Sequence, residues 1–136
     1  MTRKEFKEKF LEIFAADVSP KNKKKYNLES EKGLLWNLFA AKLVPCFEGT
    51  AAREEYDKAD KTNARMIEYD SCWMFCLPPH KNPSAKALPP ELFTAEGVDK
   101  HLYPESYVFE ENFSWCYVTT HADSCGPYFC YNPKLK

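Results

Sequence analysis

The hydrophobic positions at the start of the chain are spaced for a helix. Apolar residues recur every three or four positions and charged residues fill the gaps, which predicts one apolar helical face. The segment Thr2–Glu5 has the Thr-x-x-Glu form of a capping box, in which the two side chains satisfy free amides at a helix start. We therefore predict a helix over residues 3–16, which ends before Ser19-Pro20. Its apolar face holds Phe6, Phe10, Leu11, Ile13 and Phe14.

Two more helices are predicted from start signals, and one apolar segment is ambiguous. Gly49-Thr50 opens a helix to about residue 62, and Thr94 is placed to cap a short helix over residues 95–102. Residues 34–39 are apolar without a clear period, which fits either a buried strand or a short helix. We predict a strand there. The second helix places three side chains on one face, namely Ala52, Tyr56 and Ala59.

The later apolar segments are typical of strands. Residues 66–77 carry apolar side chains in both alternating positions, which predicts a central strand with Trp73 in the core. Residues 106–109, 113–121 and 127–131 are closely spaced and strand-like, and the last two are predicted to form a hairpin. Alternation puts on one face of the hairpin Trp115, Tyr117, Thr119, His121, Phe129 and Tyr131. It puts on the other face Ser114, Cys116, Val118, Thr120, Tyr128 and Cys130.

These elements predict one α+β domain over residues 1–136. The 136 residues match the commonest size of a single domain, and 44% hydrophobic residues supply enough material for one core. We expect an antiparallel or mixed sheet of about five strands covered by about three helices. Residues 1–32, the first helix and a lysine-rich loop, are expected to be appended to that core.

The charge balance gives no general attraction to nucleic acid or to an anionic membrane. Nineteen basic and twenty acidic side chains leave a formal charge of −1. Residues 21–25 include four lysines, which fit either a phosphate contact or a solvated linker. We favour the linker because no aromatic residue is interleaved to stack on bases. The sequence thus predicts neither nucleic-acid binding nor membrane binding.

We predict a cytoplasmic protein whose cysteines are thiols. The N-terminal segment is charged and lacks the apolar stretch and small-residue cleavage site of a secretory signal. The longest nearly apolar stretch, residues 34–44, is much shorter than the roughly 18 to 20 residues that cross a bilayer. A reducing compartment keeps cysteines as thiols. If oxidised, the six cysteines would allow fifteen pairings, among which the sequence does not choose.

The densest group of reactive side chains lies at the predicted hairpin end. His121, Asp123 and Cys125 supply an imidazole, a carboxylate and a thiol, a mixture that suits acid–base or nucleophilic chemistry. The same segment is also typical of an ordinary turn, since Asp and Ser side chains bond local amides and a histidine can end a strand. We favour the structural interpretation, because no nucleophile elbow or other spaced catalytic motif accompanies these residues.

No metal or cofactor is predicted. Alternation sends Cys116 and Cys130 to the face opposite His121, and the chain has no Cys-x-x-Cys pair of the kind that forms a zinc knuckle. Cys72 and Cys76 are about 13 Å apart along a strand, too far to share one ion. The chain has four glycines and no glycine-rich phosphate loop.

The aromatic residues near the C-terminus form either core or a surface for recognition. Dense aromatic side chains usually form core, and the absence of interleaved arginine or lysine favours that interpretation. If the chain binds a partner, the candidate contact residues are Trp115, Tyr117, His121, Tyr128 and Tyr131.

Several short motifs carry a family resemblance. Residues 113–121 read Phe-Ser-Trp-Cys-Tyr-Val-Thr-Thr-His, residues 126–129 read Gly-Pro-Tyr-Phe, and two earlier stretches read Trp-x-Leu-Phe at 36–39 and Glu-Gly-x-Ala-x-x-Glu at 48–54. Together they resemble a family of small uncharacterised bacterial proteins, whose members look like Phe-Ser-Trp-Thr-Tyr-Val, Thr-His-Glu and Gly-Pro-Tyr-Phe at the C-terminal end. Residues 1–32 have no clear counterpart. The sequence departs from the pattern at Cys116, where threonine is expected, and at Ala122, where an acid is expected.

The resemblance implies a bacterial origin and a shared fold, without a mechanism. Small bacterial domains often act by binding another protein, as antitoxins and immunity proteins do, and this analogy guides the expectation. We expect non-enzymatic binding, with another protein as the partner. The alternative is a small hydrolase or transferase that uses His121, Asp123 and Cys125.

Overall fold

The described part of the chain contains a six-stranded antiparallel sheet at its centre. The computed structural model describes residues 1–29, 35–68, 85–100, 105–120 and 126–135. The strands follow the order β1-β6-β5-β4-β2-β3 across the sheet, and every neighbouring pair is antiparallel. Their bounds are β1 (Phe47–Glu48), β2 (Ala64–Glu68), β3 (Lys86–Ala87), β4 (Ser106–Glu110), β5 (Trp115–Thr119) and β6 (Tyr128–Tyr131).

The predicted C-terminal hairpin is confirmed. β5 and β6 pair in the register that sets Cys116 opposite Cys130 and Tyr117 opposite Phe129. The predicted division between the two faces is confirmed for the buried residues of the hairpin, whereas His121 lies outside the described residues. β4 matches the predicted strand before them. β2 matches the start of the strand predicted at 66–77, whereas Trp73 lies outside the described residues.

The three predicted helices begin where the sequence signals place them, at Arg3, Thr50 and Ala95. The Glu5 backbone N–H donates to the Thr2 hydroxyl at 3.2 Å, and the Glu5 carboxylate accepts from the Thr2 N–H at 3.0 Å, which completes the capping box. The Gly97 N–H donates to the predicted cap, Thr94, at 3.1 Å. No helix in the described part of the chain is long and apolar enough to span a membrane. The helices are α1 (Arg3–Phe14), α2 (Pro20–Lys25), α3 (Asn37–Ala40), α4 (Thr50–Lys58) and α5 (Ala95–Asp99), with 3-10 turns η1 (Pro90–Leu92) and η2 (Pro133–Leu135).

The strand predicted at residues 34–39 is wrong. Its described part forms a turn that leads into helix α3. Leu35, Leu38 and Phe39 are all buried, and their spacing of three and four positions turns them toward the sheet on one helical face. A segment of six residues is too short to distinguish the helical spacing of apolar side chains from the continuous apolar run of a buried strand.

The lysine-rich segment predicted as a loop is also helical. The Asn22 N–H donates to the Ser19 hydroxyl at 3.2 Å, and Pro20 occupies the first helical turn, where its missing N–H costs nothing. The same Ser-Pro pair that predicted the end of the first helix therefore begins α2. No residue of α2 is buried, so its lysines face solvent, as expected for a solvated segment.

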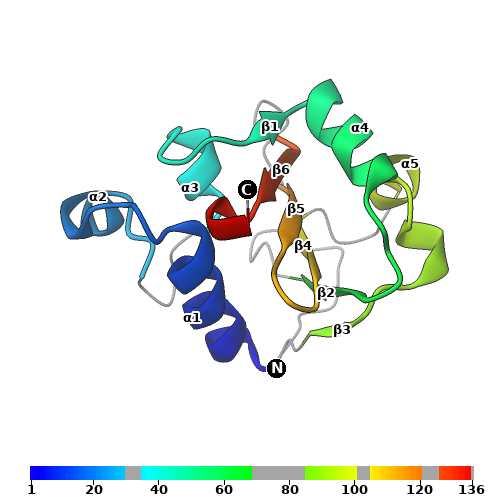
Figure 1. The fold of residues 1–136 in the computed structure, drawn as a ribbon, viewed down its shortest axis with the longest axis horizontal. Coiled ribbons are helices and arrows are strands. Elements are labelled where there is room, and N and C mark those ends of the chain that lie inside the picture. Colours follow the sequence, from blue (N-terminus) through cyan, green and yellow to red (C-terminus); the bar gives the residue numbers. More distant parts are fainter. Residues whose placement is uncertain (30–34, 69–84, 101–104, 121–125, 136) are drawn as a thin grey trace, which may run out of the picture.

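Helices cover both faces of the sheet and create two cores. α1 and α3 lie on one face, and α4 and α5 lie on the other (Figure 1). We call the first cluster the α1 core; its members include Phe6, Phe10, Phe14, Leu35, Leu38, Phe39, Tyr107, Phe109, Phe113, Cys116, Val118, Tyr128 and Cys130. We call the second cluster the α4 core; its members include Ala52, Tyr56, Met66, Leu92, Val98, Val108, Trp115, Tyr117 and Phe129.

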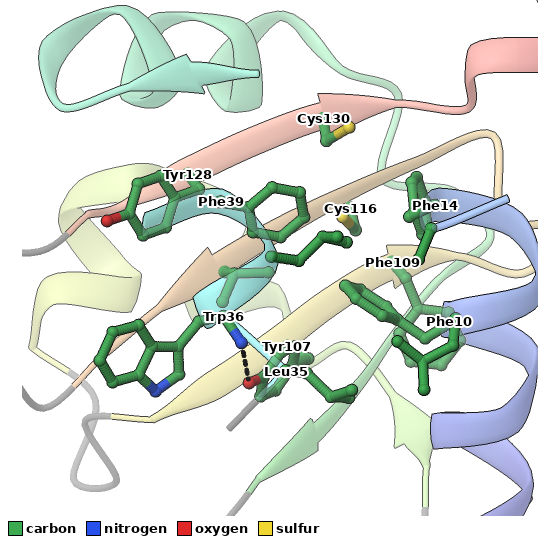
Figure 2. Close-up of a cluster of buried hydrophobic side chains, with 14 of the residues drawn as sticks. Phe10, Phe14, Leu35, Trp36, Phe39, Tyr107, Phe109, Cys116, Tyr128 and Cys130 are labelled. Atoms are coloured by element: carbon green, nitrogen blue, oxygen red, sulfur yellow. Dashed lines mark hydrogen bonds between the residues drawn. The ribbon is translucent and has the colours of Figure 1, made fainter. Parts of the chain in front are cut away.

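The N-terminal helix is part of the α1 core. The Phe6 ring centroid lies 4.9 Å from that of Phe109 and 5.7 Å from that of Tyr107. Phe10 and Phe14 extend from α1 toward the same strands (Figure 2). The N-terminal segment, expected to be appended, therefore supplies much of the apolar surface that covers this face of the sheet.

Candidate functional site

The structure divides the predicted binding residues between interior and surface. Trp115, Tyr117 and Tyr128 are buried, and their rings pack inside the two cores. Tyr131 is instead 40% exposed at the end of β6. Of the four predicted contact residues that the structure describes, Tyr131 is therefore the one with surface available to a partner.

The predicted reactive group lies outside the described residues. This applies to His121, Asp123 and Cys125, so the enzymatic alternative stays a prediction. Thr120 and Gly126 are the described residues on either side of that segment, and they follow β5 and precede β6.

Two buried glutamates lie at the end of the sheet where β5 ends. Glu68 sits opposite Ser106 on β4 and is 4% exposed, with its Oε1 atom 2.6 Å from Lys86 Nζ. Glu105 is 3% exposed and accepts from the indole N–H of Trp36 at 3.3 Å. A buried carboxylate needs such partners because its desolvation is costly. These contacts give both glutamates a structural role. The sequence did not reveal this role, because it shows only a charged residue next to an apolar strand.

Aromatic rings of the α4 core form a continuous row. Tyr56 and Tyr117 stack with centroids 4.1 Å apart and planes 10° apart, and Tyr56 meets Trp115 edge-on at 5.9 Å. The Trp115 and Phe129 rings stack at 5.5 Å. Phe129 then contacts Tyr131 at 4.9 Å. The row thus runs from the interior of the molecule to its surface.

The row ends in an exposed aromatic pair, Phe47 and Tyr131. Their ring centroids lie 6.2 Å apart in a T-shaped arrangement, and the two residues are 39% and 40% exposed. The Tyr131 hydroxyl donates to Glu55 Oε2 at 2.7 Å, which fixes the ring against α4. This hydrogen bond lowers the pKa of Glu55, while burial and the same bond raise the pKa of Tyr131 to about 12. The hydrogen bond and the ring contacts hold the pair in place.

The exposed pair lies on the edge of the sheet. β1 is the outermost described strand on this side, and it pairs with β6 alone. The Gly49 N–H donates to the Pro127 carbonyl at 2.9 Å. Alternate residues of an antiparallel strand bond to the same neighbour, so the backbone groups of Glu48 point away from β6. An exposed edge of this kind is a template for another strand.

Polar side chains fasten α4 to α5 beside the row. Arg53 forms an ion pair with Asp99, and the Asp57 carboxylate accepts from the Ala95 N–H at 2.8 Å at the start of α5. The Tyr56 hydroxyl donates to the Leu92 carbonyl. These contacts hold the helices over the sheet, and their residue types were not singled out from the sequence.

The Tyr117 hydroxyl has no hydrogen-bond partner among the described residues, although it is fully buried. Burial raises the pKa of Tyr117 and of the stacked Tyr56, so both phenols stay protonated through the neutral range. A buried hydroxyl without a partner costs free energy. Among the described residues, the Tyr117 hydroxyl is thus a polar group of the α4 core whose desolvation no hydrogen bond offsets.

Sequence reasoning missed Phe47 and Glu55, which complete the surface around Tyr131. No strand was predicted at Phe47, because a two-residue strand after Pro45 has too little periodicity to detect. Glu55 lies on the predicted second helix, but only the fold brings α4 beside the end of β6. The one available signal was the alternation along β6, which placed Tyr131 on the same face as Trp115.

Comparisons with known proteins give one family. A family model described as a domain of unknown function matches residues 2–129. The match begins at residue 2 and so includes the N-terminal helix α1. The motifs that carried the family resemblance in the sequence lie after this helix. Comparison with curated proteins and with solved structures finds no match. Because the family model spans nearly the whole chain, the protein belongs to the DUF4275 family.

Proposed function

We propose that this protein is a non-enzymatic binding domain that docks an extended segment of another protein at the β1 edge. The observation that carries the proposal is the exposed pair Phe47–Tyr131, which the aromatic row and Glu55 hold next to a strand edge that pairs with no other described strand. Aromatic side chains are enriched at the centres of protein interfaces. A small domain that covers a surface of another protein, as immunity proteins and antitoxins do, needs no catalytic group.

The chemistry around the pair indicates what kind of segment fits. An added strand would bond to the outward backbone groups of Glu48, and its alternate side chains would contact Phe47 and Tyr131. Glu48, which follows Phe47 in the chain, and Glu54, which precedes Glu55, are both exposed and give this edge of the molecule a negative charge. We therefore propose an extended partner segment that carries an apolar or aromatic residue next to a lysine or arginine.

We further propose that this binding takes place in the cytoplasm. Cys46, Cys116 and Cys130 are thiols in this structure, which suits a reducing compartment.

Site-specific photo-cross-linking in the native host tests the proposal. A photoreactive phenylalanine analogue replaces Phe47 or Tyr131, and irradiated cells are analysed for covalent adducts by mass spectrometry. Phe93 offers a matched control, because it is an aromatic residue of similar exposure, 38%, located near α5 and away from β1. We expect the same discrete adduct from positions 47 and 131 and none from position 93.

The charge of the surface provides a second arm of the experiment. Glu48→Lys should weaken the adduct at position 47 at least several-fold if the partner segment is basic. Adducts that are equal at positions 47 and 93 would refute docking at this edge. An adduct with the mass of two copies of this chain would instead show self-association and would refute a heterologous partner.

A further inference from the structure

Three thiols form a row across the sheet beside β1. Cys116 on β5 lies opposite Cys130 on β6, and both side chains face the α1 core. β1 begins at Phe47, which pairs with Phe129, and the same register carried one residue further back sets Cys46 opposite Cys130. Cys46 also packs against the α1 core, and the Cys130 Sγ atom lies 3.5 Å from the Pro45 carbonyl oxygen, next to the Cys46 amide. Cys130 therefore has one thiol on each side.

The two neighbours of Cys130 occupy different kinds of ladder position. The Gly49 N–H donates to Pro127 O at 2.9 Å, so the positions 49/127 and 47/129 are hydrogen-bonded pairs. Continued one residue beyond β1, the same alternation makes 46/130 a non-hydrogen-bonded position. The Asn132 N–H donates to Ser114 O at 2.9 Å, so 116/130 is a hydrogen-bonded pair. Side chains come closer at non-hydrogen-bonded pairs, and a disulfide needs Cβ atoms about 3.8 Å apart. The ladder thus favours a bond between Cys46 and Cys130.

Access from solvent points to the same pair. Cys46 is half-buried at the sheet edge, whereas Cys116 is fully buried behind it and Cys130 is nearly so. Of these three described thiols, Cys46 is the one that a small oxidant in solution can reach first, and Cys130 on the neighbouring strand lies behind it. Cys116 has no surface through which an oxidant can approach.

We propose that Cys46 and Cys130 form a reversible disulfide that staples β1 to β6 when a low-molecular-weight disulfide is present. The Cys46 thiolate attacks one sulfur of the oxidant, which forms a mixed disulfide and releases one small thiolate. The Cys130 thiolate then attacks the Cys46 sulfur, which closes the internal bond and releases the second small thiolate. The protein loses two protons and two electrons, and the oxidant is reduced to two thiols. The inference stands whether or not the β1 edge docks a partner.

The environment of Cys46 makes this a slow reaction at neutral pH. Burial, together with the nearby charge of Glu48, raises the pKa of Cys46 to about 11. Because only the thiolate is nucleophilic, the rate should rise about tenfold per pH unit and continue to rise above pH 9, where an ordinary thiol levels off. Once closed, the bond constrains the long loop between residues 46 and 130, which favours the folded chain.

Incubation of the full chain with glutathione disulfide at mildly alkaline pH tests the staple. After alkylation, digestion with trypsin and chymotrypsin separates Cys46, Cys116, Cys125 and Cys130 onto different peptides, because cleavage follows Arg53, Tyr117 and Phe129 among other sites. We expect a peptide pair that links Cys46 to Cys130 and a loss of two hydrogen atoms from the intact mass. The oxidised chain should melt about 5 to 15 °C higher than the reduced chain, and dithiothreitol should reverse the shift.

Two variants separate the geometric argument from general oxidation. Cys46→Ser should abolish both the link and the rise in Tm, whereas Cys116→Ala should leave the Cys46–Cys130 link in place even if that variant is less stable. A link between Cys116 and Cys130 in the wild-type chain would overturn the proposal. So would a wild-type chain in which Cys46 remains a free thiol or a mixed disulfide with glutathione while it is folded.

Discussion

The α1 core is packed mainly by phenylalanine rings, whereas the α4 core is built around tyrosine and tryptophan rings that carry hydrogen-bonding groups. On the first side, Phe6 contacts Phe10 at 5.6 Å and Phe109 at 4.9 Å, with no polar atom in any of these rings. On the second side, Tyr56 both stacks on Tyr117 and bonds through its hydroxyl to the Leu92 carbonyl. The α1 core contains hydrogen bonds as well, from the Trp36 backbone N–H to the Tyr107 hydroxyl at 3.1 Å and from the Trp36 indole to Glu105, but most of its rings are phenylalanines that pack by shape alone.

This difference separates stability from recognition. The α1 core closes over its side chains almost completely, so its residues stabilise the fold and have no surface to offer. The α4 core continues outward to Phe47 and Tyr131, where the same kind of packing reaches solvent. Substitutions in the first core should therefore affect folding, and substitutions at the outer end of the second should affect binding.

The largest effect is expected in the α1 core. Phe6→Ala should lower the free energy of unfolding by about 3 to 5 kcal/mol, because it removes a fully buried ring and leaves a cavity between α1 and the sheet. Urea denaturation measures the change. Phe6→Leu is the matched control, and it should lower the free energy of unfolding by less than about 1.5 kcal/mol relative to wild type. An unchanged midpoint in Phe6→Ala would mean that α1 does not form part of the core.

The paired hydroxyl of the α4 core gives the next effect. Tyr56→Phe keeps the ring stacked on Tyr117 but leaves the buried Leu92 carbonyl without its donor. The free energy of unfolding should fall by about 1 to 3 kcal/mol. Denaturation of the variant under the same conditions as Phe6→Ala measures the loss, and a neutral result would show that the hydroxyl contact contributes nothing.

The unpaired hydroxyl on the adjacent ring should respond in the opposite direction. Tyr117→Phe removes a buried polar atom that has no partner among the described residues, so stability should rise by about 1 kcal/mol. The shift in Tm is the measurement, with Tyr56→Phe as the isosteric comparison. A loss of stability in both variants would mean that Tyr117 pairs with a group outside the described residues.

The smallest effect is expected at the exposed end of the row. The hydrogen bond from Tyr131 lowers the pKa of Glu55 in the folded state below the ordinary glutamate pKa of 4.5. The contact therefore stabilises the protein fully at pH values above 4.5, and this stabilisation is lost as the pH falls through the lowered pKa. Glu55→Gln should therefore cost less than about 1 kcal/mol at pH 7. The difference from wild type should shrink as the pH falls below about 4.5. A difference that grows toward low pH would contradict this sign.

Much of the fold follows from patterns that are local in sequence. The Thr2–Glu5 capping box, the spacing of Phe6, Phe10 and Phe14, and the alternation along residues 113–121 each predicted an element that the structure contains. The short elements were not predictable in the same way. β1, β3 and α3 have two to four residues, and a window of that length contains less than two periods of any pattern.

The candidate site was predictable only in part, because it joins residues that are distant in sequence. Alternation placed Tyr131 on a face with Trp115, but burial of Trp115, Tyr117 and Tyr128 depends on which helices cover each face. Phe47 and Glu55 reach Tyr131 only after β1 pairs with β6 and α4 packs across the sheet. No local pattern encodes such contacts, since they depend on chain segments about 80 residues apart.

The sequence by itself determined the α+β class, the starts of α1, α4 and α5, and the two faces of the β5–β6 hairpin. Side-chain spacing and capping chemistry act within a few residues, so these features are readable without a fold. Only the tertiary structure decided the strand order, the burial of three aromatic residues predicted to bind, and the row from Cys46 to Cys116. Those features arise from pairing between strands, whose register is set by the packing of both faces at once.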